Sequence, residues 1–437
     1  MRTQAEVNSS HWFGDLPSDW QMLPVSALFR FSKGLSITKS DLVANGSTVI
    51  SYGQVHSKEN KSVETCDALY RCVPVELASA NPSARVFQEG FIFADTSEDL
   101  DGCGANVRNG SGREIYGGYH TIVLNPRRQF ASKYLAYLFT TDAWRWQIRR
   151  DLVDVKLFSV NQITLSETYI VLPPVKTQTA IVSYLDKRCA VIDDDLVKRR
   201  KAIEKLKEYK KSFISHAVTK GLDQNTEMKD SGVEWIGKIP SDWTLAKVKS
   251  CLTFSKQRNP GGELQVLSLY REYGVIPKAS RDDNHNKTSE DVSTYKYVLP
   301  GDLVVNKMKA WQGSLGLSMY EGIVSPAYFV YKIDNKVIDK HFLHYLVRSS
   351  LYAQRWNALS YGIREGQWDL HKEDFESDYL ILPPLKTQSM IAKKLDEQCV
   401  SVDEAITRQE QIIEKLIEYR KSIIHYAVTG KIDCTEK

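Results

Sequence analysis

The feature that most constrains this chain is an internal duplication. Residues 172–178 read LPPVKTQ and residues 382–388 read LPPLKTQ, an offset of 382 − 172 = 210 residues. At the same offset, EKLKEYKKSFISHAV in 204–218 returns as EKLIEYRKSIIHYAV in 414–428. Repeats this long indicate duplicated domains, because solenoid units span only about 20 to 50 residues.

A second repeated segment marks where each copy begins. Residues 12–20 read WFGDLPSDW and residues 235–243 read WIGKIPSDW, an offset of 235 − 12 = 223 residues. The proline of this segment precedes the Pro-Pro pair by 173 − 17 = 156 residues in the first copy and by 383 − 240 = 143 in the second. The sequence therefore predicts two dissimilar modules held in two similar frames.

Length and composition limit the class of protein. A chain of 437 residues exceeds what one hydrophobic core usually supports. It has no uncharged apolar run of about 18 residues and no secretory signal pattern, so we expect a cytoplasmic protein without membrane contact. The seven cysteines are odd in number and include no Cys-x-x-Cys pair, which favours reduced thiols over disulfides or a zinc site. A net charge of +4 permits nucleic-acid binding without requiring it.

Each copy is predicted to end in a long helix. No glycine or proline occurs from residue 175 to 218, and the preceding Pro-Pro pair can open a helix but cannot lie inside one. Seam positions then recur at alternating steps of four and three, which is the heptad pattern of coiled coils. The apolar members of this seam, repeated at the offset of 210, include Leu185, Ile192, Leu196, Ile203, Leu206, Leu395, Val402, Ile406, Ile413 and Leu416.

Polar residues interrupt both seams at Arg199, Lys210, Gln409 and Arg420. Such residues can fix the register of paired helices at some cost in stability. Alternatively, their long stems cover apolar surface while the polar ends extend into solvent. We favour the second interpretation.

The two helices are expected to pair with each other. A helix of about 43 residues is roughly 65 Å long, too long to be buried against one small domain. If the copies are related by a pseudo-twofold axis, the helices are antiparallel and carry one module at each end. The first segment of the chain then replaces the lead-in that is missing after the second helix. We therefore predict neighbouring termini, a foldable circular permutant opened near residues 223–230, and an altered spacing between half-sites when four residues are inserted between Leu196 and Leu206.

The modules have a mixed pattern. Short apolar runs bounded by glycine, proline or asparagine are typical of strands, and one longer segment in each module is predicted to be helical. The expected strands are 48–52, 91–94, 121–124, 169–172, 264–269, 302–306, 328–331 and 379–382, and the expected helices are 133–149 and 340–359. The predicted fold class is α+β.

Several loops combine cationic, amide and aromatic side chains. Arginine and lysine can bond guanine O6 and N7, and glutamine and asparagine can bond adenine N6 and N7, so such loops suit phosphate contact and base reading. Each loop alone is more often a solvated turn. The candidate DNA-binding residues are Arg108, Asn109, Arg113, Tyr119, His120, Lys307, Lys309, Trp311, Gln312, Arg364 and Gln367.

Motifs for several enzyme classes are missing. The sequence has no G-x-x-x-x-G-K-[ST] phosphate loop, no H-E-x-x-H motif and no Asn-Pro-Pro-aromatic loop of amino-methyltransferases. His120 and Asp95 are a conceivable acid/base pair, although a lone histidine in a glycine-rich turn is usually a surface group. We therefore predict no catalytic residues and no metal ligands.

Together these segments resemble the specificity (S) subunit of type I restriction–modification systems. The resemblance covers essentially the whole chain, but the first module lacks the Lys-Met-Lys-Ala-Trp stretch of the second. It rests on DSGVEWIGKIP in 230–240, GDLVVNKMKAWQG in 301–313, GIVSP in 322–326 and the twice-used LPPxKTQ segment.

The resemblance implies a division of the chain and a set of partners. Residues 1–174 and 222–384 would be target recognition domains for the halves of a split, asymmetric duplex DNA sequence. Residues 175–221 and 385–437 would carry the spacer helices, whose seam residues would also serve in partner docking. The family implies two modification subunits that methylate adenine with S-adenosylmethionine, and restriction subunits that use ATP and Mg²⁺. No cofactor is expected on this chain.

Two alternatives are left open. In the first, the chain is a non-catalytic scaffold whose modules bind protein or surface ligands on a coiled-coil rod. In the second, it is a restriction enzyme with its own nuclease and methylase, which is disfavoured because no residues remain to house them. A salt-dependent shift of duplex DNA, strengthened by a co-expressed methyltransferase, would separate the DNA reader from the scaffold.

Overall fold

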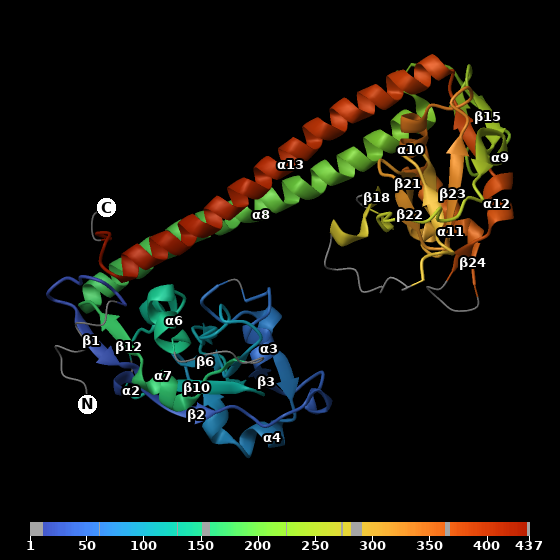
Figure 1. Cartoon of the computed structure of the whole chain (residues 1–437). Coiled ribbons are helices and arrows are strands. Elements are labelled where there is room, and N and C mark those ends of the chain that lie inside the picture. Colours follow the sequence, from blue (N-terminus) through green and yellow to red (C-terminus); the bar gives the residue numbers. More distant parts are fainter. Residues whose placement is uncertain are drawn as a thin grey trace. The chain divides into compact units, whose positions relative to one another are not determined.

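The computed structural model describes residues 12–60, 62–128, 130–150, 158–223, 225–271, 274–280, 291–362 and 368–434. The chain forms two compact units. Unit 1 contains residues 1–198 and 411–437, and unit 2 contains residues 199–410. Each unit combines a mixed domain of strands and helices with part of each long helix (Figure 1). Within the described ranges, no helix has the length and hydrophobicity that a bilayer span requires.

Unit 1 is built on a four-stranded antiparallel sheet with the order β2-β10-β6-β8. Successive side chains of a strand point to opposite faces, and strand β6 buries both. Phe91 and Phe93 pack with α5 and α6, while Ile92 and Ala94 pack with a second sheet of order β4-β3-β9-β5. The elements are β1 (Gln21–Pro24), α2 (Val25–Leu28), β2 (Phe29–Lys33), η1 (Lys39–Asp41), β3 (Ser47–Ile50), α3 (Tyr52–Val55), η2 (Asp67–Leu69), β4 (Arg71–Val73), α4 (Val75–Ser79), η3 (Pro82–Ala84), β5 (Arg85–Val86), β6 (Phe91–Ala94), β7 (Thr96–Ser97), β8 (Asn106–Arg108), β9 (Ile115–Gly117), β10 (Thr121–Pro126), α5 (Lys133–Leu138), α6 (Asp142–Arg149), β11 (Phe158–Ser159), α7 (Gln162–Glu167) and β12 (Tyr169–Leu172).

Unit 2 repeats this plan with the sheet order β16-β23-β20-β21. Leu303 and Val305 of its central strand β20 pack with α10 and α11, whereas Val304 packs with the strands on the other face. The elements are β13 (Met228–Asp230), β14 (Lys238–Pro240), β15 (Thr244–Lys247), α9 (Val248–Cys251), β16 (Leu252–Phe254), β17 (Leu267–Tyr270), β18 (Gly274–Pro277), η4 (Lys278–Ser280), β19 (Lys296–Val298), β20 (Leu303–Asn306), η5 (Ala310–Gln312), β21 (Leu315–Leu317), β22 (Gly322–Val324), β23 (Tyr328–Ile333), α10 (Lys340–Arg348), α11 (Ser350–Leu359), β24 (Ser360–Tyr361), β25 (Asp369–Leu370), α12 (Lys372–Ser377) and β26 (Tyr379–Leu382).

The α+β class is confirmed, but the helix within each module was predicted wrongly as one piece. The expected helix 133–149 is divided into α5 and α6, and the expected helix 340–359 into α10 and α11. Thr141 and Ser349 interrupt these helices with extended backbone angles. Thr141 accepts a hydrogen bond from the backbone of Trp144, so its side chain satisfies the start of a new helix.

The same short frame closes both units. In unit 1, β1 pairs antiparallel with β12, with Gln21 opposite Leu172. In unit 2, β15 pairs antiparallel with β26, with Thr244 opposite Leu382. The strands that lead into each Pro-Pro pair therefore have the same partner in both copies.

The two long helices begin where the Pro-Pro pairs predict. Helix α8 extends over Val175–Lys220 and α13 over Leu385–Val428. Predicted seam residues that are buried are Leu185, Ile192, Leu196, Ile203, Leu395 and Val402. Those that are half-buried are Leu206, Ile406, Ile413 and Leu416.

Pairing of the helices is antiparallel within each unit. In unit 1, Arg420 Nε donates to Asp193 Oδ1 over 3.0 Å. In unit 2, Lys210 Nζ donates to Asp403 Oδ2 over 2.6 Å, and Arg199 Nη1 donates to the amide oxygen of Gln409 over 2.9 Å. The interpretation that these four polar residues only extend into solvent was therefore wrong. They make hydrogen bonds between the helices and so specify the register.

The segment after each long helix packs against an equivalent lead-in. A Cβ atom on Gly221 would lie 3.5 Å from the Trp243 ring, and one on Gly430 would lie 3.2 Å from the Trp20 ring. Trp12 and Cys434, the described ends of the chain, pack against the same hydrophobic cluster of unit 1. The first segment of the chain thus takes the place of a lead-in after α13, as predicted.

Candidate nucleic-acid interface

The candidate interface lies at the same end of the central sheet in both units. In unit 1 this is where β6 ends and β10 begins, with Ala94 opposite Thr121. In unit 2 it is where β20 ends and β23 begins, with Asn306 opposite Tyr328. We call these positions the sheet ends of unit 1 and unit 2.

Main-chain hydrogen bonds confirm that the two sheet ends are equivalent. Asp95, which follows β6, accepts a hydrogen bond from Val160 N over 2.7 Å, and Lys307, which follows β20, accepts one from Leu370 N over 2.9 Å. Val160 and Leu370 are separated by 370 − 160 = 210 residues, the offset of the duplication. The same backbone position therefore carries a carboxylate in unit 1 and an ammonium group in unit 2.

The sheet end of unit 1 holds a histidine and an aspartate together. Nδ1 of His120 lies 2.9 Å from Asp95 Oδ1, and the hydroxyl of Thr96 donates to the same oxygen over 2.7 Å. The His120 side chain is 39% exposed, which leaves its ring open to solvent. The structure thus places His120 and Asp95 in contact, although the sequence had favoured an isolated surface histidine.

Aromatic rings surround this pair. The His120 ring packs edge-on against Tyr119 and Tyr52, with centroid distances of 4.1 and 5.6 Å. Nε2 of His56 lies 2.9 Å from the carbonyl oxygen of Thr96, which ties α3 to the same cluster. Tyr119 is exposed and stands beside His120 at the surface.

The sheet end of unit 2 carries the predicted Lys-Met-Lys-Ala-Trp segment. Lys307 Nζ forms a 2.8 Å ion pair with Asp369, whereas Lys309 is exposed. The Trp311 ring packs edge-on against Trp368, with centroids 5.3 Å apart. Gln312 ends the short helix η5 and is half-buried. The structure therefore brings four of the predicted residues together in one segment.

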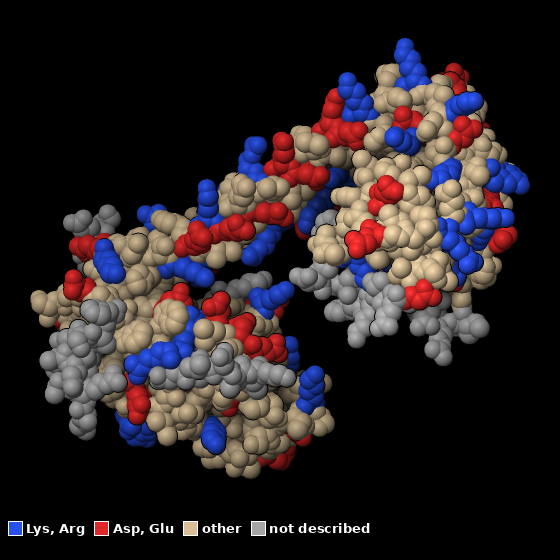
Figure 2. Space-filling view, in the orientation of Figure 1, with Lys and Arg blue, Asp and Glu red and all other residues tan. Residues whose placement is uncertain are grey.

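Further lysines border the sheet end of unit 2. The ammonium groups of Lys296 and Lys372 lie 5.4 and 5.1 Å from the Phe254 ring. Burial, followed by the nearby Lys307 ammonium, lowers the pKa of Lys296. Figure 2 shows Lys and Arg side chains gathered on unit 2 near α12. Lysine side chains therefore border this sheet end, although Lys372 is paired with Glu376 over 2.9 Å.

A hollow of about 520 Å³ adjoins the predicted segment of unit 2. Trp311 and Gln312 line one side, and the exposed face of α11 lines another. Cationic side chains from three elements also reach it, namely Lys211, Arg271 and Arg348. Gln312 thus borders a basic surface.

Arg108 and Asn109 are placed differently from the prediction. Arg108 pairs with Phe91 at the opposite end of β6 and is buried, with its guanidinium bound to Glu64, Glu89 and Ser132. Asn109 is also buried, and its amide donates to the carbonyl oxygens of Val86 and Arg113. Because their polar atoms serve internal contacts, we leave both residues out of the proposed interface.

Of the remaining predicted residues, Arg113 is not part of the sheet ends. Arg113 is exposed, pairs with Asp67 over 3.3 Å and lies over the Tyr70 ring. Arg364 and Gln367 lie outside the described residues. Thr96, Tyr52, Trp368 and Asp369 were missed as members of the site, and Asp95 was considered only as an acid/base partner of His120. The offset of 210, applied to residues 160 and 370, was the signal that could have located part of it.

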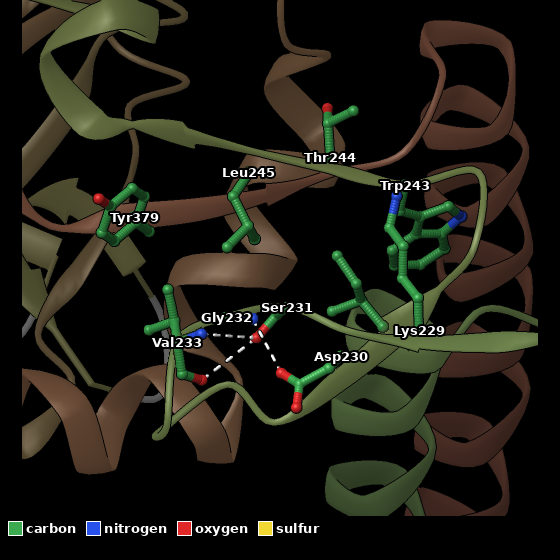
Figure 3. Close-up of a pocket in the computed structure, with 10 residues that line it drawn as sticks. Lys229, Asp230, Ser231, Gly232, Val233, Trp243, Thr244, Leu245 and Tyr379 are labelled. Carbon is green, nitrogen blue, oxygen red and sulfur yellow. Dashed lines mark hydrogen bonds between the residues drawn. The ribbon is translucent and has the colours of Figure 1, made fainter.

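A second hollow, of about 420 Å³, lies between the lead-in hairpin and β15 of unit 2 (Figure 3). Polar groups that line it are hydrogen-bonded to one another within a single turn. Gly232 N donates to Asp230, and Val233 N donates to the Ser231 hydroxyl. These groups are used in holding the hairpin, and we assign the hollow no role in binding.

Comparisons with known proteins agree with this architecture. Residues 240–416 match the family model described as Type I restriction modification DNA specificity domain. The chain is 26% identical over 221 residues to the type I restriction enzyme EcoKI specificity subunit of Escherichia coli, covering 46% of this chain and 45% of that protein. It is 25% identical over 330 residues to the putative type I restriction enzyme MjaX specificity subunit of Methanocaldococcus jannaschii, covering 72% of each.

Solved structures show the same fold. The crystal structure of the HsdS subunit from Thermoanaerobacter tengcongensis matches with a TM-score of 0.53 and 17% identity, over 96% of this chain and 98% of that chain. A chain from a study of complex assembly and conformational transition of the type I R-M system matches with a TM-score of 0.70 and 16% identity, over 96% and 100% of the two chains. In its matched specificity domain and in its fold, the chain is therefore similar to type I restriction–modification specificity subunits.

Proposed function

We propose that this chain recognises a bipartite, asymmetric DNA sequence as the specificity subunit of a type I restriction–modification complex. The observation that carries the proposal is the pair of sheet ends. One scaffold occurs twice, and the residue that follows its central strand is Asp95 in one unit and Lys307 in the other. Two readers that share a scaffold but differ in side chains suit two unlike half-sites.

The chemistry of the sheet ends supports DNA as the ligand. Lys309 is exposed beside an aromatic pair and the Gln312 amide, a combination that suits phosphate contact together with base-edge hydrogen bonding. In unit 1, Tyr119 and His120 present a stacking surface and a ring nitrogen. We propose these residues, with Lys307 and Trp311, as the DNA-contacting set.

Catalysis is assigned to partners. We propose that two modification subunits methylate adenine with S-adenosylmethionine, that restriction subunits supply the ATP- and Mg²⁺-dependent activity, and that the assembly is cytoplasmic. The surfaces of α8 and α13 are the proposed docking sites. Exposed Tyr209 and Tyr419 occupy equivalent positions on these helices, as two copies of one partner would require.

Mapping methylated adenines tests the function directly. A host that carries the modification subunit should show one bipartite motif when the full-length chain is present and should lose it when the chain is removed. If duplex DNA is not bound and no motif depends on the chain, the proposal fails and the protein-interaction scaffold is favoured.

A matched pair of lysine variants tests the interface. Lys309 is at the sheet end of unit 2, where β23 begins. Lys336 is exposed in the turn that follows the last residue of β23, at the opposite end of that strand. Neutralising a phosphate-contacting lysine reduces the slope of log affinity against log salt concentration by about 1. We expect this change for Lys309→Gln and no change for Lys336→Gln. Equal slopes for both variants would remove Lys309 from the interface.

A further inference from the structure

His120 has a strained backbone at the sheet end of unit 1. Its φ is 54°, and among the described residues only one other non-glycine residue, Glu89, has a positive φ. Such a conformation is strained and persists only where the surroundings enforce it, typically at functional sites. The strained backbone therefore marks the His120 loop as a candidate functional site.

The surrounding contacts enforce the conformation through the main chain. Tyr119 N donates to the Ser51 hydroxyl over 3.1 Å, Tyr52 N donates to Tyr119 O over 3.0 Å, and Asp95 N donates to His120 O over 3.1 Å. Space is also restricted, because a Cβ atom on Gly118 would lie 2.2 Å from the Ser51 hydroxyl. The loop from Gly118 to His120 is thus rigidly placed.

The side chain of His120 is oriented by Asp95. A carboxylate can only accept hydrogen bonds, so the 2.9 Å contact between Nδ1 and Asp95 Oδ1 assigns the ring proton to Nδ1. The Thr96 hydroxyl, which donates to the same oxygen, holds the carboxylate in place. In a neutral imidazole with the proton on Nδ1, the other nitrogen, Nε2, is a hydrogen-bond acceptor.

We propose that His120 reads one base of the half-site bound by unit 1 through Nε2, and that Asp95 is the positioning residue that makes this atom an acceptor. The complementary group is an exocyclic amino group in the major groove, which is N4 of cytosine or N6 of adenine. This inference rests on the proposed function and specifies its chemistry in unit 1.

The test uses the full-length chain with its modification subunit and reads the methylation motif in a host genome. His120→Gly removes the imidazole and is compatible with the positive φ. Because one base contact is lost, we expect discrimination at one position of one half-site to fall by roughly 10-fold. The base pair at that position of the wild-type motif tells which amino group is read: N4 of cytosine in a C·G pair, or N6 of adenine in an A·T pair. The other half-site is the internal control.

Asp95→Asn tests the positioning role. An asparagine amide can donate to Nδ1, which moves the ring proton to Nε2 and converts that atom into a donor. We expect the same position to accept guanine, whose N7 and O6 are acceptors. The ¹⁵N shifts of the His120 ring in labelled protein should report the change of tautomer, a readout that a purely structural role would not move.

Two outcomes would overturn the inference while leaving the proposed function intact. These are an unchanged motif in His120→Gly and a uniform loss across the half-site. If the wild-type chain directs no motif, the proposed function fails and the inference fails with it.

Discussion

Replacing Arg108 with methionine decides whether this residue stabilises unit 1 or contacts DNA. Its side chain is 7% exposed, and its guanidinium lies 2.8 Å from Glu64, 2.7 Å from Glu89 and 2.9 Å from Ser132. Arg108→Met would leave the Glu89 carboxylate, which is only 18% exposed, without its main cation. Removing one partner of a buried ion pair typically costs about 3–5 kcal/mol, and we expect the free energy of unfolding to fall by that order.

The pH dependence gives a second signature of the same contact. Burial opposes the ionisation of Glu89, but hydrogen bonds from Arg108 and Ser132 outweigh it and lower the pKa of this carboxyl. Stability from a carboxyl with a lowered pKa is present above its unfolded value, here 4.5, and is lost as the pH falls through the folded value. The deficit of Arg108→Met should therefore be largest near neutral pH and shrink in acid.

Urea unfolding at several pH values measures both effects, with Arg113→Met as the matched control. Arg113 lies in the loop that follows β8, and its ion pair with Asp67 has exposed fractions of 52% and 95% for the two side chains. Such surface pairs contribute about 0–1 kcal/mol. A loss below about 1 kcal/mol in Arg108→Met, together with loss of one methylation half-site, would refute the structural assignment and restore Arg108 as a DNA contact.

Three further predictions concern the frame. Lys210→Glu should destabilise the chain by roughly 0.5–1 kcal/mol through repulsion with Asp403, and adding Asp403→Lys should recover most of it, as a double-mutant cycle would show. A second change inserts seven residues in α8 between Asp193 and Lys210 and seven in α13 between Asp403 and Arg420, which adds about 10 Å to each helix. The gap between the half-sites in the methylation motif should then widen by about three base pairs. The same insertion in α8 alone should destabilise the protein, because one interhelical ion pair loses its register. A circular permutant opened between Asp223 and Asp230 should retain its far-ultraviolet circular dichroism and its motif, and a molten or insoluble product would contradict the packing of Gly430 against Pro17.

The frame could be predicted because its signals are local and occur twice. Two adjacent prolines can open a helix but cannot lie inside one. With the stretch free of glycine and proline that follows each pair, they located the helix starts at Val175 and Leu385. The heptad seam similarly follows from neighbouring residues along one helix. The register of the pair was harder, because Arg420 and Asp193 are 227 residues apart.

The interface could be predicted only in part, because its contacts are not local. Lys307, Lys309 and Trp311 were found together because they lie close to one another in the sequence, directly after a strand. Arg108 looked like a similar loop residue, yet its partner Glu64 is 44 residues away and draws it into the protein. The role of a charged side chain therefore depends on distant carboxylates that spacing along the chain does not reveal.

The contrast between frame and readers has a physical cause. Asp193 and Asp403 are equivalent at the offset of 210, as are Lys210 and Arg420, so both interhelical ion pairs are one contact made twice. When two equivalent helices pair antiparallel, an acidic position in one copy meets the basic position of the other, and both copies must keep both charges. The sheet ends carry no such constraint. Asp95 and Lys307 hold the scaffold through a backbone carbonyl, which every residue possesses, so their side chains can change without loss of the fold.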